Sequence, residues 1–146
     1  MYYEDFSPNQ KFSVKSVTVD EERMLAFARE YDPVPLHTDE DYAKATRFGR
    51  LIAPGVMSFM TVWAKFVEND IFADELIAGK STKIEWFAPV FAGDVLSSEV
   101  FVSSMTERNA YNGIVELTFR VFNQGGKLVL TNVTETVVKR KAPISD

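Results

Sequence analysis

The sequence predicts an α+β fold, in which a curled antiparallel sheet wraps around one long, buried central helix. The first half of the 146-residue chain is rich in turns and helical repeats. The second half, from about residue 80, alternates polar and apolar residues as strands do. Between the halves, Gly55–Val67 is apolar or small on nearly every side, which is typical of a buried helix. A sheet that curls around such a helix buries both the helix and one sheet face.

Composition limits the possible functions. With 46% hydrophobic and 25% charged residues, the chain resembles an ordinary folded domain, and we expect one domain over residues 1–146. It has no cysteine and one histidine, which excludes thiolate chemistry and the common zinc sites, so no metal is expected. The net charge of −5 argues against nucleic acid and, more weakly, against an anionic membrane. The first ten residues lack the order of a signal peptide, so we expect a soluble cytoplasmic protein.

Two helices are predicted before residue 46. Residues 12–17 read as a strand, and Thr18 with Glu21 fits a capping box that would open the first helix. The prolines at positions 33 and 35 end this helix, and Thr38 would cap a second one over residues 39–45. The apolar stripe of the first helix consists of Met24, Phe27, Ala28 and Tyr31.

The central helix is expected to follow a turn around Gly49. Pro54 suits its first turn, where the missing N–H has no intrahelical partner. The segment is interrupted too soon, by Lys65 and Glu68, to span a bilayer, which favours a buried helix.

Four later runs are predicted to form a meander of antiparallel strands. Apolar residues alternate around residues 82–86, 96–102 and 115–121, and residues 128–139 make a last β-rich run. Residues 112–113 (Asn-Gly) and 124–126 (Gln-Gly-Gly) supply turn residues that tolerate positive φ. Such a sheet around one helix is the hot-dog architecture.

The best candidates for catalysis are Asp32 and His37. They stand five residues apart across two prolines, which restrict the backbone and can hold the side chains in a fixed relation on a loop. His37 precedes the expected helix cap, where the partial positive charge would favour a neutral imidazole that can act as a base. The alternative is that His37 is a structural residue and that Asp32 only ends a helix.

A second candidate lies at Pro54 and Gly55. Glycine has no side chain, so a ligand oxygen could approach the Gly55 N–H closely. The start of a buried helix would then stabilise negative charge on a thioester carbonyl, as an oxyanion hole does. The alternative is that the two residues simply begin a helix.

These segments resemble a known family. Residues 32–37, Asp-Pro-Val-Pro-Leu-His, are similar to the Asp-x-Asn-Pro-x-His signature of the MaoC-like dehydratases and (R)-specific enoyl-CoA hydratases. Residues 3–6, 49–55 and 87–94 also resemble family members, so the similarity covers most of the chain.

The resemblance implies a hydro-lyase that adds water to an enoyl thioester or removes it in reverse. His37 would act as the base on water, Asp32 would position the water and relay a proton, and the Gly55 N–H would bind the thioester carbonyl. Coenzyme A or acyl carrier protein would arrive as part of the substrate, with no separate cofactor. The family also implies a homodimer, or a higher homo-oligomer of dimers, in which two sheets join near the acyl tunnel.

The chain departs from the family pattern at two positions. Val34 replaces the signature's asparagine, and Tyr31 replaces a small residue before Asp32. Together with Pro54, these residues are expected to contact the substrate and to change the size and shape of its pocket. The basic residues that could meet a nucleotide phosphate are Lys65, Lys83, Arg47 and Arg50.

Three other functions compete with this one. A hot-dog thioesterase needs a carboxylate on the central helix, and Gly55–Val67 contains none. A non-catalytic subunit that binds acyl thioesters would be expected to lack Asp32 or His37, and both are present. A plain ligand-binding domain would account for the core but leaves this pair without a purpose.

Overall fold

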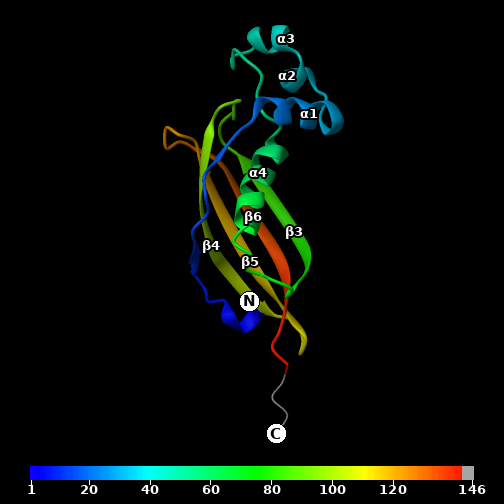
Figure 1. Cartoon of the computed structure of the whole chain (residues 1–146), viewed down its shortest axis with the longest axis vertical. Helices are drawn as coiled ribbons and strands as arrows, with labels where there is room; N and C mark the ends of the chain where they lie inside the picture. Colours follow the sequence, from blue (N-terminus) through cyan, green and yellow to red (C-terminus); the bar gives the residue numbers. More distant parts are fainter. Residues whose placement is uncertain (143–146) are drawn as a thin grey trace.

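A computed structural model of the protein describes residues 1–142 and shows one curled sheet wrapped around one long helix (Figure 1). The sheet has six strands. Three short helices gather beyond one end of the sheet, next to the start of the long helix. In chain order the elements are η1 (Tyr3–Asp5), β1 (Lys11–Phe12), β2 (Val17–Thr18), α1 (Glu21–Tyr31), α2 (Pro35–Thr38), α3 (Glu40–Lys44), α4 (Gly55–Val67), β3 (Leu76–Trp86), β4 (Val95–Glu107), β5 (Asn112–Phe122) and β6 (Leu128–Lys139). The predicted hot-dog architecture is confirmed.

The strand order is β1-β4-β5-β6-β3, with β2 also paired to β4, and all pairs are antiparallel. The predicted meander is therefore correct for β4 to β6 but wrong for β3, which pairs with β6 at the far edge. Residues 87–94 make the crossing from β3 to β4. The Phe87 N–H donates to the Val129 carbonyl at 2.9 Å, and the Val19 N–H donates to the Asp94 carbonyl at 2.8 Å. These bonds hold the crossing segment over the end of the sheet.

The core lies between α4 and the concave face of the sheet. Every second residue of β5 from Val115 to Val121 is fully buried, as the alternation predicted. The Phe119 ring lies 5.4 Å from the rings of both Phe59 and Phe66 on α4, measured between centroids. This aromatic cluster fixes α4 against the middle of the sheet.

The prediction that α4 is buried on all sides is wrong for the single chain. Val56, Met60 and Val67 are each about half exposed, because the sheet covers only one side of the helix. Pro54 also stands one position earlier than predicted, as the residue before the first helical one.

The N-terminal half differs in detail from the prediction. Residues 12–17 do not form one strand, because the chain pairs with β4 at β1 and again at β2 but leaves it in between. Thr18 belongs to β2, and Asp20 caps α1 by accepting the backbone N–H three residues later. In the same way Asp39, rather than Thr38, caps α3. A carboxylate one or two residues beyond each threonine takes the capping role.

The turns are partly as predicted. Residues 124–126 form a turn with Gly126 at φ +75°, which glycine adopts without strain. Asn112 and Gly113, in contrast, begin β5, and the turn lies at residues 108–111, where the Asn109 side chain accepts two backbone N–H groups. Within residues 1–142, no helix is long and apolar enough to cross a membrane.

Candidate active site

Asp32 and His37 meet where α1 ends and α2 begins. Asp32 is the first residue beyond α1, with φ −150° and ψ 66°, and Pro35 opens α2 two residues before His37. The Oδ2 atom of Asp32 lies 3.2 Å from Nε2 of His37. The His37 side chain is 10% exposed and that of Asp32 is 43% exposed, so the pair lies at the boundary between core and solvent. The segment that was predicted to be a loop is thus partly a helical turn. This turn brings the side chains of Asp32 and His37 together.

The second ring nitrogen of His37 fixes the tautomer. Nδ1 lies 2.7 Å from the main-chain oxygen of Ile52. A carbonyl oxygen can only accept, so Nδ1 carries the proton and donates it. In neutral His37 the Nε2 lone pair therefore faces Asp32. His37 lies in the last turn of α2 and two residues before Asp39, the cap of α3, so an effect of that helix N-terminus on the charge of His37 stays a prediction. The Ile52 carbonyl sets the tautomer of the neutral ring.

The segment before α4 is held by main-chain hydrogen bonds to two other segments. The Ala53 N–H donates to the Val90 carbonyl at 2.7 Å, and the Ile52 N–H donates to the Leu36 carbonyl at 3.4 Å. These bonds tie α2, the start of α4 and the crossing segment into one unit. The orientation of His37 consequently depends on main-chain contacts that are far apart in sequence.

Asp32 and His37 open into a cavity of about 500 Å³, a volume in the range of small-molecule sites. Gly55 also lines it, at the first turn of α4, where main-chain N–H groups have no partner inside the helix. The remaining lining residues are Leu36, Arg47, Phe48, Ile52, Ala53, Ser58, Trp86, Phe87, Ala88, Pro89 and Val90.

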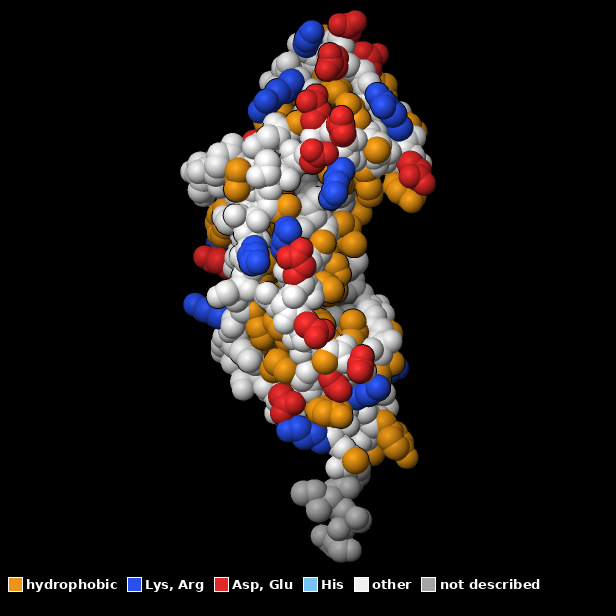
Figure 2. Space-filling view, in the orientation of Figure 1, with side chains coloured by type: hydrophobic (Ala, Val, Ile, Leu, Met, Phe, Trp, Pro, Cys, Tyr) orange, Lys and Arg blue, Asp and Glu red, His pale blue; other side chains and the backbone are white. Residues whose placement is uncertain are grey.

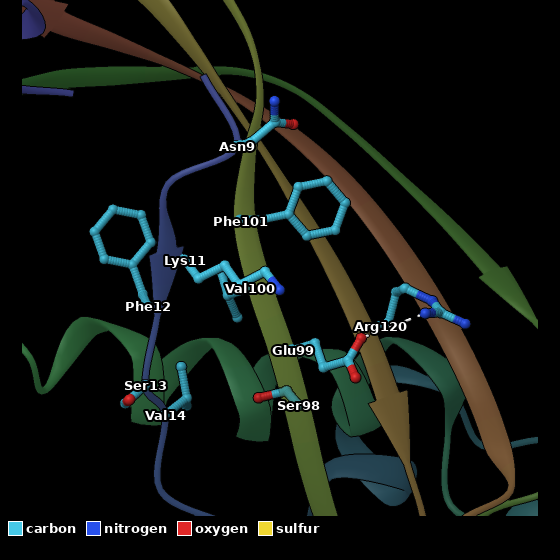
Figure 3. Close-up of a pocket in the computed structure, with 10 residues that line it drawn as sticks. All are labelled: Asn9, Lys11, Phe12, Ser13, Val14, Ser98, Glu99, Val100, Phe101 and Arg120. Carbon is cyan, nitrogen blue, oxygen red and sulfur yellow. Dashed lines mark hydrogen bonds and ion pairs between the residues drawn. The ribbon is translucent and has the colours of Figure 1, made fainter. Parts of the chain in front are cut away.

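A larger hollow of about 690 Å³ lies between the N-terminal segment and β4 (Figure 3). Glu99 and Arg120 point toward each other there from neighbouring strands, with 3.3 Å between the charged groups. Both are well exposed, and neither Asp32 nor His37 lines this hollow. The smaller cavity is the candidate active site because it contains the acid–base pair.

The structure brings together three of the six predicted site residues. Asp32, His37 and Gly55 line one cavity. Tyr31 is 68% exposed and packs on Phe27 of its own helix, and Val34 is 45% exposed. Pro54 is buried beside the cavity without lining it. A contact of Tyr31, Val34 or Pro54 with substrate stays a prediction.

Sequence reasoning missed two prominent residues of the site. Ser58, one turn after Gly55, is buried and lines the cavity with its hydroxyl 3.4 Å from the Pro54 carbonyl. Trp86 lies directly against Gly55, where an added Cβ would overlap the indole ring. The alternation of β3 placed Trp86 on one strand face, but nothing in the sequence indicated which helix residue it would meet. Of the four basic residues considered, Arg47 alone lines the cavity.

The chain is similar to known proteins over most of its length. A sequence model described as "MaoC like domain" matches residues 5–121. The chain is 33% identical over 105 residues to an (R)-specific enoyl-CoA hydratase from Aeromonas caviae, covering 72% of this chain and 73% of that protein. It is 28% identical to the uncharacterized protein YdeM of Bacillus subtilis, over 96% of this chain and all of that one. The crystal structure of a MaoC-like dehydratase from Rhodospirillum rubrum superposes with a TM-score of 0.86 at 29% identity, covering 97% of this chain and 98% of that chain.

Proposed function

Because the chain belongs to the MaoC-like domain family, we propose that it is a hydro-lyase acting on acyl thioesters. It would add water to trans-2-enoyl thioesters or remove it from 3-hydroxyacyl thioesters. The observation that carries the proposal is the pair of Asp32 Oδ2 and His37 Nε2, 3.2 Å apart at the wall of the cavity.

The pair can activate one water molecule. Since Nδ1 donates its proton to the Ile52 carbonyl, Nε2 of the neutral ring and the Asp32 carboxylate are both acceptors, and both residues line the cavity. A single water can donate one O–H to each of them. In hydration, His37 takes one proton as the water oxygen bonds to the β-carbon of the substrate. The pair then returns that proton to the α-carbon through Asp32, so that H and OH add across the double bond.

Gly55, which lines the same cavity, would support this reaction at the thioester carbonyl. As the double bond is attacked, negative charge develops on the thioester oxygen. The Gly55 N–H, at the start of α4 where the helix dipole favours negative charge, would donate to that oxygen. Removing one such donor typically costs about 100-fold to 1,000-fold in kcat.

Arg47 is the residue we propose for the carrier end of the substrate. Its guanidinium lies 5.0 Å from the centre of the Phe48 ring, at the cavity that holds Asp32 and His37. Coenzyme A carries phosphates, which arginine binds well. Arg47→Gln should raise KM for crotonyl-CoA but not for a crotonyl thioester that lacks the nucleotide, whereas Arg50→Gln should change neither. Equal effects of Arg47→Gln on both substrates would contradict this role.

The exposed edge of the sheet supports a homodimer. All residues of β3 except Ile84 are exposed, including Leu76 and Ile77, and an unpaired apolar edge strand is a site for pairing with another strand. α4 lies beside β3 in Figure 1, and Figure 2 shows hydrophobic side chains gathered over this part of the molecule. On α4 itself, Val56 and Met60 are about half exposed. Light scattering should give a dimer mass, and Ile77→Lys should shift it to the monomer. A wild-type monomer would contradict the proposal.

The reaction itself is tested by the absorbance of the enoyl-thioester band. Wild-type protein should remove the band of crotonyl-CoA, while Asp32→Asn and His37→Ala should abolish the loss and stay folded by circular dichroism. Glu30→Gln, an exposed neutralisation on the same helix as Asp32, is the matched control and should retain activity. Activity that survives in Asp32→Asn and His37→Ala would refute the mechanism. A wild type that binds acyl-CoA without reacting would instead indicate a non-catalytic binding subunit.

A further inference from the structure

We infer that Trp86 sets the acyl chain length by closing the cavity at the start of α4, so that short acyl thioesters are preferred. This inference rests on the proposed function, because it takes the cavity beside Asp32 and His37 to be the acyl-thioester site.

The register of the sheet directs Trp86 toward α4. Trp86 is the last residue of β3 and pairs with Leu130 of β6. Paired residues of antiparallel strands share one sheet face, and Leu130 is fully buried on the concave face. The Trp86 side chain therefore leaves the strand on the side that faces the central helix.

The indole reaches the first turn of α4 and fills the space there. A Cβ built on Gly55 would overlap the Nε1 and Cε2 atoms of Trp86 and would lie 2.8 Å from its Cζ2. No side chain fits between the helix and this ring. The ring is consequently packed against the helix backbone, although about half of the residue's surface stays exposed.

This contact closes one direction of the cavity. A thioester carbonyl bound at the Gly55 N–H would place its acyl chain beside the indole. To extend between α4 and β3, the chain would have to pass Trp86 and then Ile84, the next residue of β3 on the same face. A short acyl group can stay on the near side of the ring, whereas a long one has to displace it.

The size of the effect follows from pocket energetics. One methylene more or less in an apolar pocket changes discrimination by about 10-fold to 200-fold. Replacing Trp86 with leucine removes most of a bicyclic ring. We therefore expect the preference for a short over a long acyl chain to fall by at least about tenfold.

The test measures binding by titration calorimetry with butyryl-, octanoyl- and dodecanoyl-CoA, which are saturated and cannot be hydrated. Wild type should bind butyryl-CoA most tightly. Trp86→Leu should raise the affinity for dodecanoyl-CoA relative to butyryl-CoA by at least about tenfold, with Trp86→Phe intermediate. Tyr111→Leu, which trims an exposed aromatic residue in the turn before β5, is the control and should leave the ratio unchanged.

The possible outcomes separate the role of Trp86 from the proposed reaction. An unchanged ratio in folded Trp86→Leu, or wild-type protein that binds dodecanoyl-CoA as tightly as butyryl-CoA, overturns the inference. Absence of binding to all three ligands overturns it as well. The predicted binding pattern without hydration of crotonyl-CoA supports the role of Trp86 and refutes only the proposed reaction.

Discussion

Gly55→Ala perturbs the site by a single methyl group. The backbone of Gly55 is helical and lies outside the positive-φ region, so alanine is compatible with its conformation. The new Cβ would nevertheless overlap the Trp86 indole, and at such distances one of the two groups has to move. Since Trp86 is about half exposed, the ring can swing outward rather than force the helix to shift.

The expected loss of stability depends on whether Trp86 or the helix moves. Overpacking a well-packed position costs about 1–3 kcal/mol, and an outward movement of Trp86 favours the lower half of that range. For a chain of this size, a loss of about 1–2 kcal/mol lowers Tm by roughly 3–7 °C. Activity should fall further, because the methyl group and the displaced ring disturb the place where the Gly55 N–H meets the thioester oxygen. We expect a decrease in kcat/KM of about 100-fold.

The assay combines thermal unfolding with the enoyl-thioester absorbance. Gly79→Ala is the matched control, because a Cβ at this β3 glycine has no heavy atom within 4 Å. In the double variant with Trp86→Leu the clash is gone, so Gly55→Ala should then change Tm by no more than about 2 °C. The reasoning is refuted if Gly55→Ala matches Gly79→Ala in both Tm and kcat/KM, or if Trp86→Leu leaves the Tm loss in place.

Three further variants test other parts of the fold. Phe119→Ala should lower the free energy of unfolding by about 3–5 kcal/mol in urea denaturation, because it empties the aromatic cluster under α4; a loss below about 1 kcal/mol would contradict that packing. Asn132→Ala should cost about 1–3 kcal/mol in the same assay, since the fully buried Asn132 amide donates to the Thr82 hydroxyl at 2.7 Å; no loss would show that this bond contributes little. The Lys141 N–H, which Glu4 accepts, lowers the pKa of Glu4 below its ordinary 4.5. A carboxylate with a lowered pKa stabilises the fold above its ordinary pKa, and this stability is lost as pH falls through the lowered value. The Tm advantage of wild type over Glu4→Gln should therefore shrink below about pH 4.5, and a constant difference would refute the assignment.

Local patterns in the sequence account for much of the fold. Alternation with period two placed every second residue from Val115 to Val121 on one face of the strand, and all four of these residues are fully buried. The prolines around Asp32 and His37 predicted a fixed relation between the two side chains, and these lie 3.2 Å apart. Such features depend on residues close in sequence, so they can be recognised without knowing the tertiary structure.

The features that could not be predicted depend on contacts between distant segments. Trp86 meets Gly55 only because β3 pairs with β6 at the far edge of the sheet, whereas a simple meander would place β3 beside β4. The exposure of Val56 and Met60 on α4 was also missed, because the composition of a helix does not reveal that the sheet covers one side of it. The order of the strands, and the side of a helix that the sheet covers, depend on the whole sheet rather than on any one segment.

The tautomer of His37 is the point at which the mechanism can be tested without a substrate. The Ile52 carbonyl requires a proton on Nδ1, which leaves Nε2 free to take a proton from water when the ring is neutral. His37 is the only histidine of the chain, so nitrogen-15 NMR of histidine-labelled protein gives signals that need no assignment. At alkaline pH the spectrum should show a protonated Nδ1 and an unprotonated Nε2. The chain unfolded in urea is the control, since it should show rapid exchange between both tautomers. A proton on Nε2 in the folded, neutral protein would mean that the atom facing Asp32 is a donor, and His37 could not be the base in the proposed reaction.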